Sequence, residues 1–171
     1  MSTFRIRVEK DYIGFSAGHF ITYSGHQCET LHGHNYRVRI ALQGSLDRDF
    51  YVMDFVEIKR MMKRLCDDLD HRMLLPLHNP VLQLVETDES VSVSYKHRRF
   101  VFPSEDVVLL PIANTTAELL AQYLCGRALD ELRRQGARHL QWIEIEVEES
   151  AGQSAVYREE LTAANEGEAH D

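Results

Sequence analysis

Hydrophobic and polar residues alternate along several stretches of this chain, which is the pattern of half-buried β-strands. The alternation predicts strands at residues 4–8, 13–19, 32–43 and 142–149. Between the second and third of these, residues 22–31 carry no period and are expected to form a loop. The alternation also predicts which side chains of each strand face the core, because neighbouring residues point to opposite faces.

Two other stretches repeat their apolar residues at intervals of three and four, which is typical of amphipathic helices. Asp54 is a good N-cap for the first helix, which is expected to end near residues 67–71. In the second helix Thr115 and Glu118 have the spacing of a capping box, and Gly136 follows its expected end. Both apolar stripes are expected to pack against the sheet.

The rest of the chain shows weaker patterns. Alternation at residues 91–95 and 100–102 around a polar turn predicts a β-hairpin. Residues 159–171 are acidic and rich in small side chains, so we expect a flexible tail there. No repeat or linker divides what precedes it, and a single domain over residues 1–158 is expected.

Composition narrows the class of protein. The chain has 171 residues, of which 44% are hydrophobic and 27% charged, as in an ordinary soluble domain. Its net charge of -8 argues against non-specific nucleic-acid binding, which depends on Lys and Arg contacts to phosphate. No apolar run approaches the ~18 residues of a membrane span, and no signal sequence precedes the first strand. We therefore expect a cytoplasmic protein whose three cysteines form no disulfide framework.

The richest chemistry lies between Cys28 and Tyr36, where a thiol and two imidazoles fall within nine residues. Strand parity places His32 and His34 on the same face, with only Gly33 between them. Two imidazoles on one strand face can hold a first-row metal ion, and we expect this metal to be zinc.

A third imidazole can join these two. If the segments at 13–19 and 32–43 pair antiparallel, His19 arrives opposite His32 and His34. Three nitrogen ligands with an open fourth position are typical of a catalytic zinc site. The alternative is a closed structural site with Cys28 as the fourth ligand. Structural zinc usually takes at least two thiolates, which disfavours that alternative.

Two further acidic positions attract attention. Asp70 lies at the negative end of the first helix dipole, where a carboxylate is unfavourable. Because it is next to His71, it could orient that ring for proton transfer. Glu149 continues the inward parity of the last strand, where a carboxylate is costly without a partner. We interpret Glu149 as a ligand-binding acid. The alternative for all three residues is a solvated position at the end of an element.

Together these residues resemble the family of 6-pyruvoyltetrahydropterin and 6-carboxytetrahydropterin synthases, from Phe15 to Arg158. The matching motifs, in order, are Phe15-Ser16-Ala17-Gly18-His19, His32-Gly33-His34-Asn35-Tyr36, Met53-Asp54-Phe55, Leu69-Asp70-His71, Thr116 with Glu118, Glu149-Ser150, and Val156-Tyr157-Arg158. The resemblance implies the α+β tunnelling fold (T-fold), a four-stranded antiparallel sheet with two helices on one face. Here an insertion at about 81–110 adds the β-hairpin. The resemblance also implies a homohexamer, built from two trimers, with its sites at subunit interfaces.

The resemblance further implies a zinc-dependent lyase that acts on 7,8-dihydroneopterin triphosphate. It assigns three groups of residues: the metal ligands His19, His32 and His34, the catalytic Cys28, Asp70 and His71, and the pterin-site residues Thr116, Glu118 and Glu149. In this assignment Cys28 is the general base, the Asp70–His71 pair moves the second proton, and Glu149 anchors the pterin ring.

The spacing of Cys28 resembles that of bacterial 6-carboxytetrahydropterin synthases, which release acetaldehyde and triphosphate on the route to queuosine and other 7-deazapurines. A third group in the family carries glutamate in place of the cysteine, and Glu29 stands next to Cys28. The reaction therefore stays open between the 6-carboxy product and a 6-pyruvoyl product formed by triphosphate elimination alone. A non-catalytic pterin-binding protein on the same fold is the remaining alternative.

Overall fold

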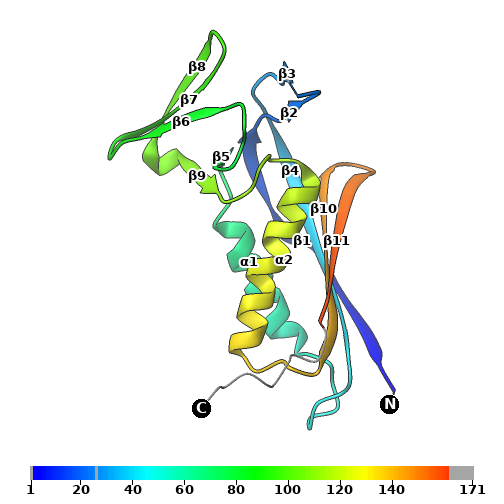
Figure 1. The fold of residues 1–171 in the computed structure, drawn as a ribbon. Coiled ribbons are helices and arrows are strands. Elements are labelled where there is room, and N and C mark those ends of the chain that lie inside the picture. The colour runs from blue at the N-terminus through cyan, green and yellow to red at the C-terminus, as the bar shows by residue number, and fades with distance from the viewer. Residues whose placement is uncertain (1, 26, 162–171) are drawn as a thin grey trace, which may run out of the picture.

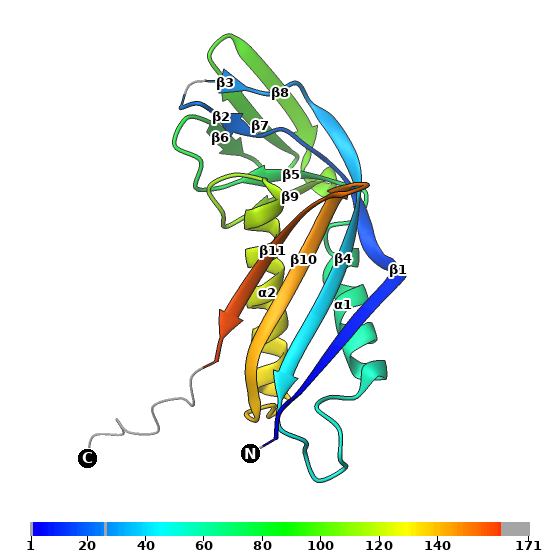
Figure 2. The same ribbon diagram turned by 90° about the vertical axis from the view of Figure 1, so that its right-hand side faces the viewer.

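A six-stranded sheet, ordered β11-β10-β4-β1-β5-β9, forms one layer of the computed structural model, which describes residues 2–25 and 27–161 (Figure 1). Its long antiparallel strands are β1 (Phe4–His19), β4 (His32–Gly44), β10 (Leu140–Ser150) and β11 (Gln153–Glu160). The helices α1 (Phe55–Asp67) and α2 (Ala117–Arg134) cover the same face of this sheet (Figure 2). The expected arrangement of four antiparallel strands and two helices is therefore present.

Two short strands extend the sheet beyond the expected four. The strand β5 (Arg72–Pro76) pairs parallel with the end of β1, and β9 (Val107–Leu110) pairs parallel with β5. Both strands are largely apolar, so their sequences show no alternation that would have predicted them.

The predicted strands at 4–8 and 13–19 are one continuous strand, β1, with an irregular register between Glu9 and Gly14. A Cβ atom on Gly14 would lie 2.3 Å from the carbonyl oxygen of Tyr36, so the close approach of β1 and β4 requires glycine there. Beyond this point the pairing is regular and places His19 opposite His32.

Helix α1 begins as predicted, because the carboxylate of Asp54 accepts the backbone amide of Val56 at 2.7 Å. The predicted apolar stripe is buried, except for Phe55, which is 51% exposed in the first turn. The N-cap of α2 is Thr116 rather than Thr115. Thr115 is buried instead, and its hydroxyl donates to the carbonyl of Phe20, so it ties the helix start to the end of β1.

The insertion forms a small sheet of its own rather than a hairpin alone. The predicted hairpin is present as β7 (Ser90–Tyr95) and β8 (Arg98–Pro103), but β6 (Gln83–Glu86) pairs with β7 as a third strand. A short 3-10 helix, η1 (Ser104–Asp106), then leads to β9. A second hydrophobic cluster joins this small sheet to the main one: Phe20, Met73, Leu75, Leu82, Val91, Val93 and Tyr95.

The segment predicted as a loop at 22–31 contains two very short strands, β2 (Thr22–Tyr23) and β3 (Gln27–Cys28), paired with each other. At the other end of the chain, β11 continues through Glu160, two residues past the expected domain boundary. The rest of the expected tail, residues 162–171, lies outside the described residues. Among the described residues, neither helix is long and apolar enough to cross a membrane.

Candidate metal centre

Three histidines converge where β1 ends and β4 begins. One nitrogen of each of His19, His32 and His34 lies within 4.8 Å of the others. The antiparallel register of β1 and β4 produces this convergence, because it sets His19 directly opposite His32 and puts His34 next on the same face. The placement expected from strand parity is confirmed.

Backbone carbonyls orient two of these rings. Nδ1 of His19 donates to the carbonyl of Thr115 at 3.0 Å, and Nδ1 of His32 donates to that of Thr30 at 2.8 Å. In a neutral ring each bond leaves Nε2 as the nitrogen without a proton, as in metal-ligating histidines whose other nitrogen is held by a carbonyl. Burial lowers the pKa of His19, which favours the neutral ring that a metal requires. The donor set therefore fits a metal ion.

A carboxylate lies beside the cluster on the strand β10. Oε1 of Glu149 is 3.5 Å from Nε2 of His19 and 3.7 Å from Nε2 of His34, and it accepts a hydrogen bond from the hydroxyl of the buried Tyr36. The register of β10 and β11 shifts between Glu148 and Ser150, and such irregularities re-aim side chains. This shift places Glu149 at the histidines, on the inward side that its parity predicts.

A cavity of about 350 Å³ opens next to the cluster at the start of α2. It is lined by His19, His32 and Glu149, together with Thr116, Glu118 and Glu29. Five of the expected site residues thus line this cavity: His19, His32, Thr116, Glu118 and Glu149. Glu29, the neighbour of Cys28 in the sequence, lines it as well.

The two neighbours Cys28 and Glu29 point in different directions. The carboxylate of Glu29 accepts the amide of Ile21 at 3.3 Å and comes within 3.9 Å of Nε2 of His32. The thiol of Cys28 instead packs against the second hydrophobic cluster and donates to the carbonyl of Glu29 at 3.6 Å. Burial raises the pKa of this thiol, although the guanidinium of Arg98 acts in the opposite direction. Of the two, only Glu29 lines the cavity.

Asp70 and His71 form the predicted pair, with Oδ2 of Asp70 2.8 Å from Nδ1 of His71. Oδ1 of Asp70 also accepts the amide of Ser16 at 2.7 Å, and this bond, followed by the His71 ring, lowers the pKa of Asp70. His71 itself has a left-handed backbone, with φ 56°, and its side chain is 82% exposed. The pair is therefore well oriented but open to solvent.

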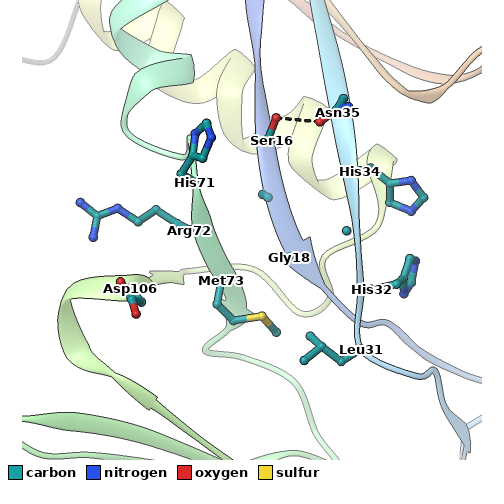
Figure 3. Close-up of a pocket in the computed structure, with 12 residues that line it drawn as sticks. Ser16, Gly18, Leu31, His32, His34, Asn35, His71, Arg72, Met73 and Asp106 are labelled. Carbon is teal, nitrogen blue, oxygen red and sulfur yellow. Dashed lines mark hydrogen bonds between the residues drawn. The ribbon is translucent and has the colours of Figure 1, made fainter.

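In the described part of the chain, no hydrogen bond or ion pair joins this pair to the histidine cluster. In Figure 3, strands β1 and β4 stand between the ring of His71 and the rings of His32 and His34. His71 lines a hollow of about 620 Å³ with Ser16 and Gly18, and His32 and His34 of the cluster also line this hollow. Neither Asp70 nor His71 lines the cavity that Glu29, Thr116, Glu118 and Glu149 line.

Comparisons with known proteins agree on one family. The family model for 6-pyruvoyl tetrahydropterin synthase matches residues 7–160. A putative 6-carboxy-5,6,7,8-tetrahydropterin synthase from Methanocaldococcus jannaschii is 39% identical over 149 residues, which cover 86% of this chain and 90% of the relative. The structure of 6-pyruvoyl tetrahydropterin synthase from Plasmodium falciparum is similar with a TM-score of 0.87 and 33% identity, over 94% of this chain and 100% of that one.

A third similar protein bears on the site. It is the Plasmodium vivax 6-pyruvoyltetrahydropterin synthase, solved as a variant in which a catalytic glutamate is replaced by alanine. This structure has a TM-score of 0.87 and 30% identity, over 94% of this chain and 100% of that chain. The likeness to these structures confirms the expected T-fold.

Proposed function

Because the chain belongs to the 6-pyruvoyl tetrahydropterin synthase family, we propose that it converts 7,8-dihydroneopterin triphosphate to 6-carboxy-5,6,7,8-tetrahydropterin, with release of acetaldehyde and triphosphate. The observation that carries this proposal is the convergence of three imidazoles beside a cavity that three glutamates line. The 6-carboxy name of the Methanocaldococcus relative supports this product, and with it a place in queuosine biosynthesis.

The metal would be zinc, held by His19, His32 and His34. A set of three imidazoles that leaves a coordination position open is typical of catalytic zinc. When bound, zinc supplies Lewis-acid polarisation to the side-chain oxygens of the substrate. The closed structural site finds no support, since the thiol of Cys28 packs against the second hydrophobic cluster rather than beside the histidines.

A base must remove a proton from the side-chain carbon of the substrate, and the segment before β4 offers two. We assign this role to Glu29, because its carboxylate lines the cavity and lies 3.9 Å from Nε2 of His32. The catalytic glutamate of the Plasmodium vivax relative supports a carboxylate in this role. Cys28, the base implied by the sequence resemblance, is the second candidate, since a change in the direction of this short segment would exchange the two side chains.

The second proton would be moved by His71, with Asp70 holding its ring. Because this pair does not line the cavity beside the cluster, and strands β1 and β4 stand between the ring of His71 and those of His32 and His34, we assign each complete site to two copies of the chain. Unpaired strand edges are available for such an assembly. In the described residues the outer edge of β11 has no partner strand. On the other side of the sheet β5 pairs with β1 only at Ala17 and Gly18, so the rest of that edge of β1 is open within the described part of the chain. A homohexamer of the kind implied by the resemblance would join these edges.

The pterin ring would be anchored by Glu149, with Thr116 and Glu118 on the same wall of the cavity. A carboxylate that accepts two N–H groups of a pterin forms a charge-assisted pair, which is strong in a partly buried site. Glu149 also lies close to two imidazoles, so a role as a metal ligand competes with this assignment. Metal analysis of a Glu149 variant separates the two roles.

A second candidate is 6-pyruvoyltetrahydropterin synthase activity, in which triphosphate is eliminated and no carbon–carbon bond breaks. The similarity to the two Plasmodium enzymes and the orientation of Glu29 favour it. Incubation of the zinc-loaded protein with 7,8-dihydroneopterin triphosphate distinguishes the candidates. We expect acetaldehyde and triphosphate in equal amounts. Triphosphate without acetaldehyde would indicate the 6-pyruvoyl reaction, and release of neither product would contradict both.

The choice of base is tested by two variants under the same conditions. Glu29→Gln should lower kcat by about a hundredfold or more, because general-base catalysis contributes roughly 10²–10⁴. Cys28→Ala should lower it far less. The reverse order would return the role of base to Cys28.

A further inference from the structure

The insertion reaches the candidate site through one side chain. Arg98 is the first residue of β8, and its Nη1 donates to two backbone carbonyls, that of Cys28 at 3.1 Å and that of Glu29 at 2.9 Å. These two carbonyls belong to the residues that offer the two candidate bases. Arg98 therefore binds the segment that carries both.

Arg98 is itself held in place by aromatic rings. Its guanidinium lies 5.3 Å from the ring centre of Phe100, within the range of a cation–π interaction. Phe100 stacks on Phe20 with ring centres 5.5 Å apart, and Phe20 directly follows the metal-site residue His19. The position of the guanidinium is thus fixed relative to the end of β1.

The direction of the peptide at Cys28 and Glu29 decides which side chain faces the metal site. Adjacent residues of an extended chain point to opposite sides, so only one of the two can face the histidines. With both carbonyls bound to Arg98, the thiol of Cys28 packs toward the insertion and the carboxylate of Glu29 lines the cavity.

We propose that Arg98 is a positioning residue, which holds the segment so that the carboxylate of Glu29, and not the thiol of Cys28, faces the three histidines. The inference rests on the proposed lyase function. It gives the insertion a specific role, which is to select the acid–base group that the reaction uses. Arg98 needs no contact with the substrate for this role.

The first test compares Arg98→Ala with Arg98→Lys and with the control Arg99→Ala, an exposed arginine on the same strand. Displacement of a catalytic group by about 1 Å can cost roughly a hundredfold. We expect Arg98→Ala to lower kcat by about ten- to a hundredfold, with KM changed less than about twofold and zinc content unchanged. Arg98→Lys should recover part of the loss, because an ammonium group can donate to one of the two carbonyls.

Arg99→Ala should match the original protein in each of these measurements. A normal kcat in Arg98→Ala, or a loss that Arg98→Lys does not reduce at all, would overturn the proposal. Circular dichroism checks that the variants fold. If Arg98→Ala does not fold, the comparison of Arg98→Lys with the original protein still tests the proposal.

The second test combines variants. If Arg98 selects Glu29, then Glu29→Gln should abolish most activity when Arg98 is present and should lower activity by a smaller factor in the Arg98→Ala background. Cys28→Ala should instead lower activity by a larger factor in the Arg98→Ala background than when Arg98 is present. Equal fold-effects of Glu29→Gln in both backgrounds would refute positioning by Arg98 and leave the proposed function standing. Inactivity of the unaltered zinc-loaded protein would instead refute the proposed function.

A third measurement is independent of turnover. The rate at which iodoacetamide alkylates Cys28, followed by mass spectrometry, should rise several-fold in Arg98→Ala and stay unchanged in Arg99→Ala. Loss of the guanidinium cation alone would slow alkylation, because a nearby cation favours the thiolate. Faster alkylation would therefore report release of the segment, and an unchanged or slower rate would contradict the proposal.

Discussion

The two halves of the candidate site are built in different ways. The histidine cluster is held by packing and by backbone carbonyls, and His19 is 1% exposed. The Asp70–His71 pair is tied to β1 at Ser16, but the side chain of His71 is 82% exposed. Only one of the three rings, that of His19, is buried, and burial lowers its pKa, which favours the neutral ring that a metal requires. In the proposed assembly the exposed pair would complete the site of another copy of the chain.

The largest effect should come from the histidine cluster. We expect His32→Ala to bind zinc at least about a hundredfold more weakly, since the loss of a ligand exceeds the effect of losing its hydrogen-bond partner, and to lose turnover with it. The exposed turn residue His97 provides the control, and His97→Ala should retain metal. Metal analysis by mass spectrometry measures both. Full zinc occupancy in His32→Ala would remove His32 from the ligand set.

Changes in the Asp70–His71 pair should lower the rate of the reaction without changing the zinc content. We expect His71→Ala to retain zinc and to lose roughly 10²–10⁴ in kcat, the usual contribution of a general acid or base. If each site takes the cluster from one copy and His71 from another, mixed oligomers of His71→Ala and His32→Ala should regain up to about one quarter of the sites. No recovery after co-expression of the two variants would argue against a site shared between copies.

A smaller effect is expected at Glu149, which joins the metal site to the cavity. Removal of its charge should weaken the binding of a pterin by about 10- to 100-fold, the range for a hydrogen bond to a charged group. Titration of zinc-loaded Glu149→Gln with a pterin measures this loss, while zinc content should not change. Loss of zinc would instead identify Glu149 as a metal ligand.

The smallest effect concerns stability and tests the hydrogen bond that the amide of Ser16 donates to the carboxylate of Asp70. The pKa of Asp70 is lowered in the folded chain, first by the Ser16 amide and then by His71. The carboxylate therefore stabilises the fold above its unfolded pKa of about 3.9, and this contribution disappears as pH falls through the lowered folded value. Asp70→Asn should cost about 1 kcal/mol at neutral pH, since the group is partly exposed to solvent.

Thermal unfolding of the original chain and of Asp70→Asn over a range of pH measures this difference. The two melting curves should approach each other in acid. A gap of constant size at every pH would show that the aspartate acts through packing and not through its charge.

The strands and the convergence of the three histidines were predictable because their residues lie in regular elements. Alternation alone places His32 and His34 on the face of Tyr36, and it places Glu149 on the inward side of the last strand. The opposition of His19 and His32 required only that two predicted strands pair, and the register confirms this. By contrast, β5 and β9 are buried apolar runs without alternation, so nothing in their sequence distinguished them as strands.

The sequence by itself determined which groups are available: three imidazoles, a thiol, a pair of Asp70 and His71, and a carboxylate on an inward strand face. Only the tertiary structure decided that Glu29 rather than Cys28 lines the cavity beside the cluster, and that His71 does not line it. Local periodicity sets the face of a side chain within a strand. The direction of an irregular segment depends on distant contacts, here an arginine about seventy residues further along the chain.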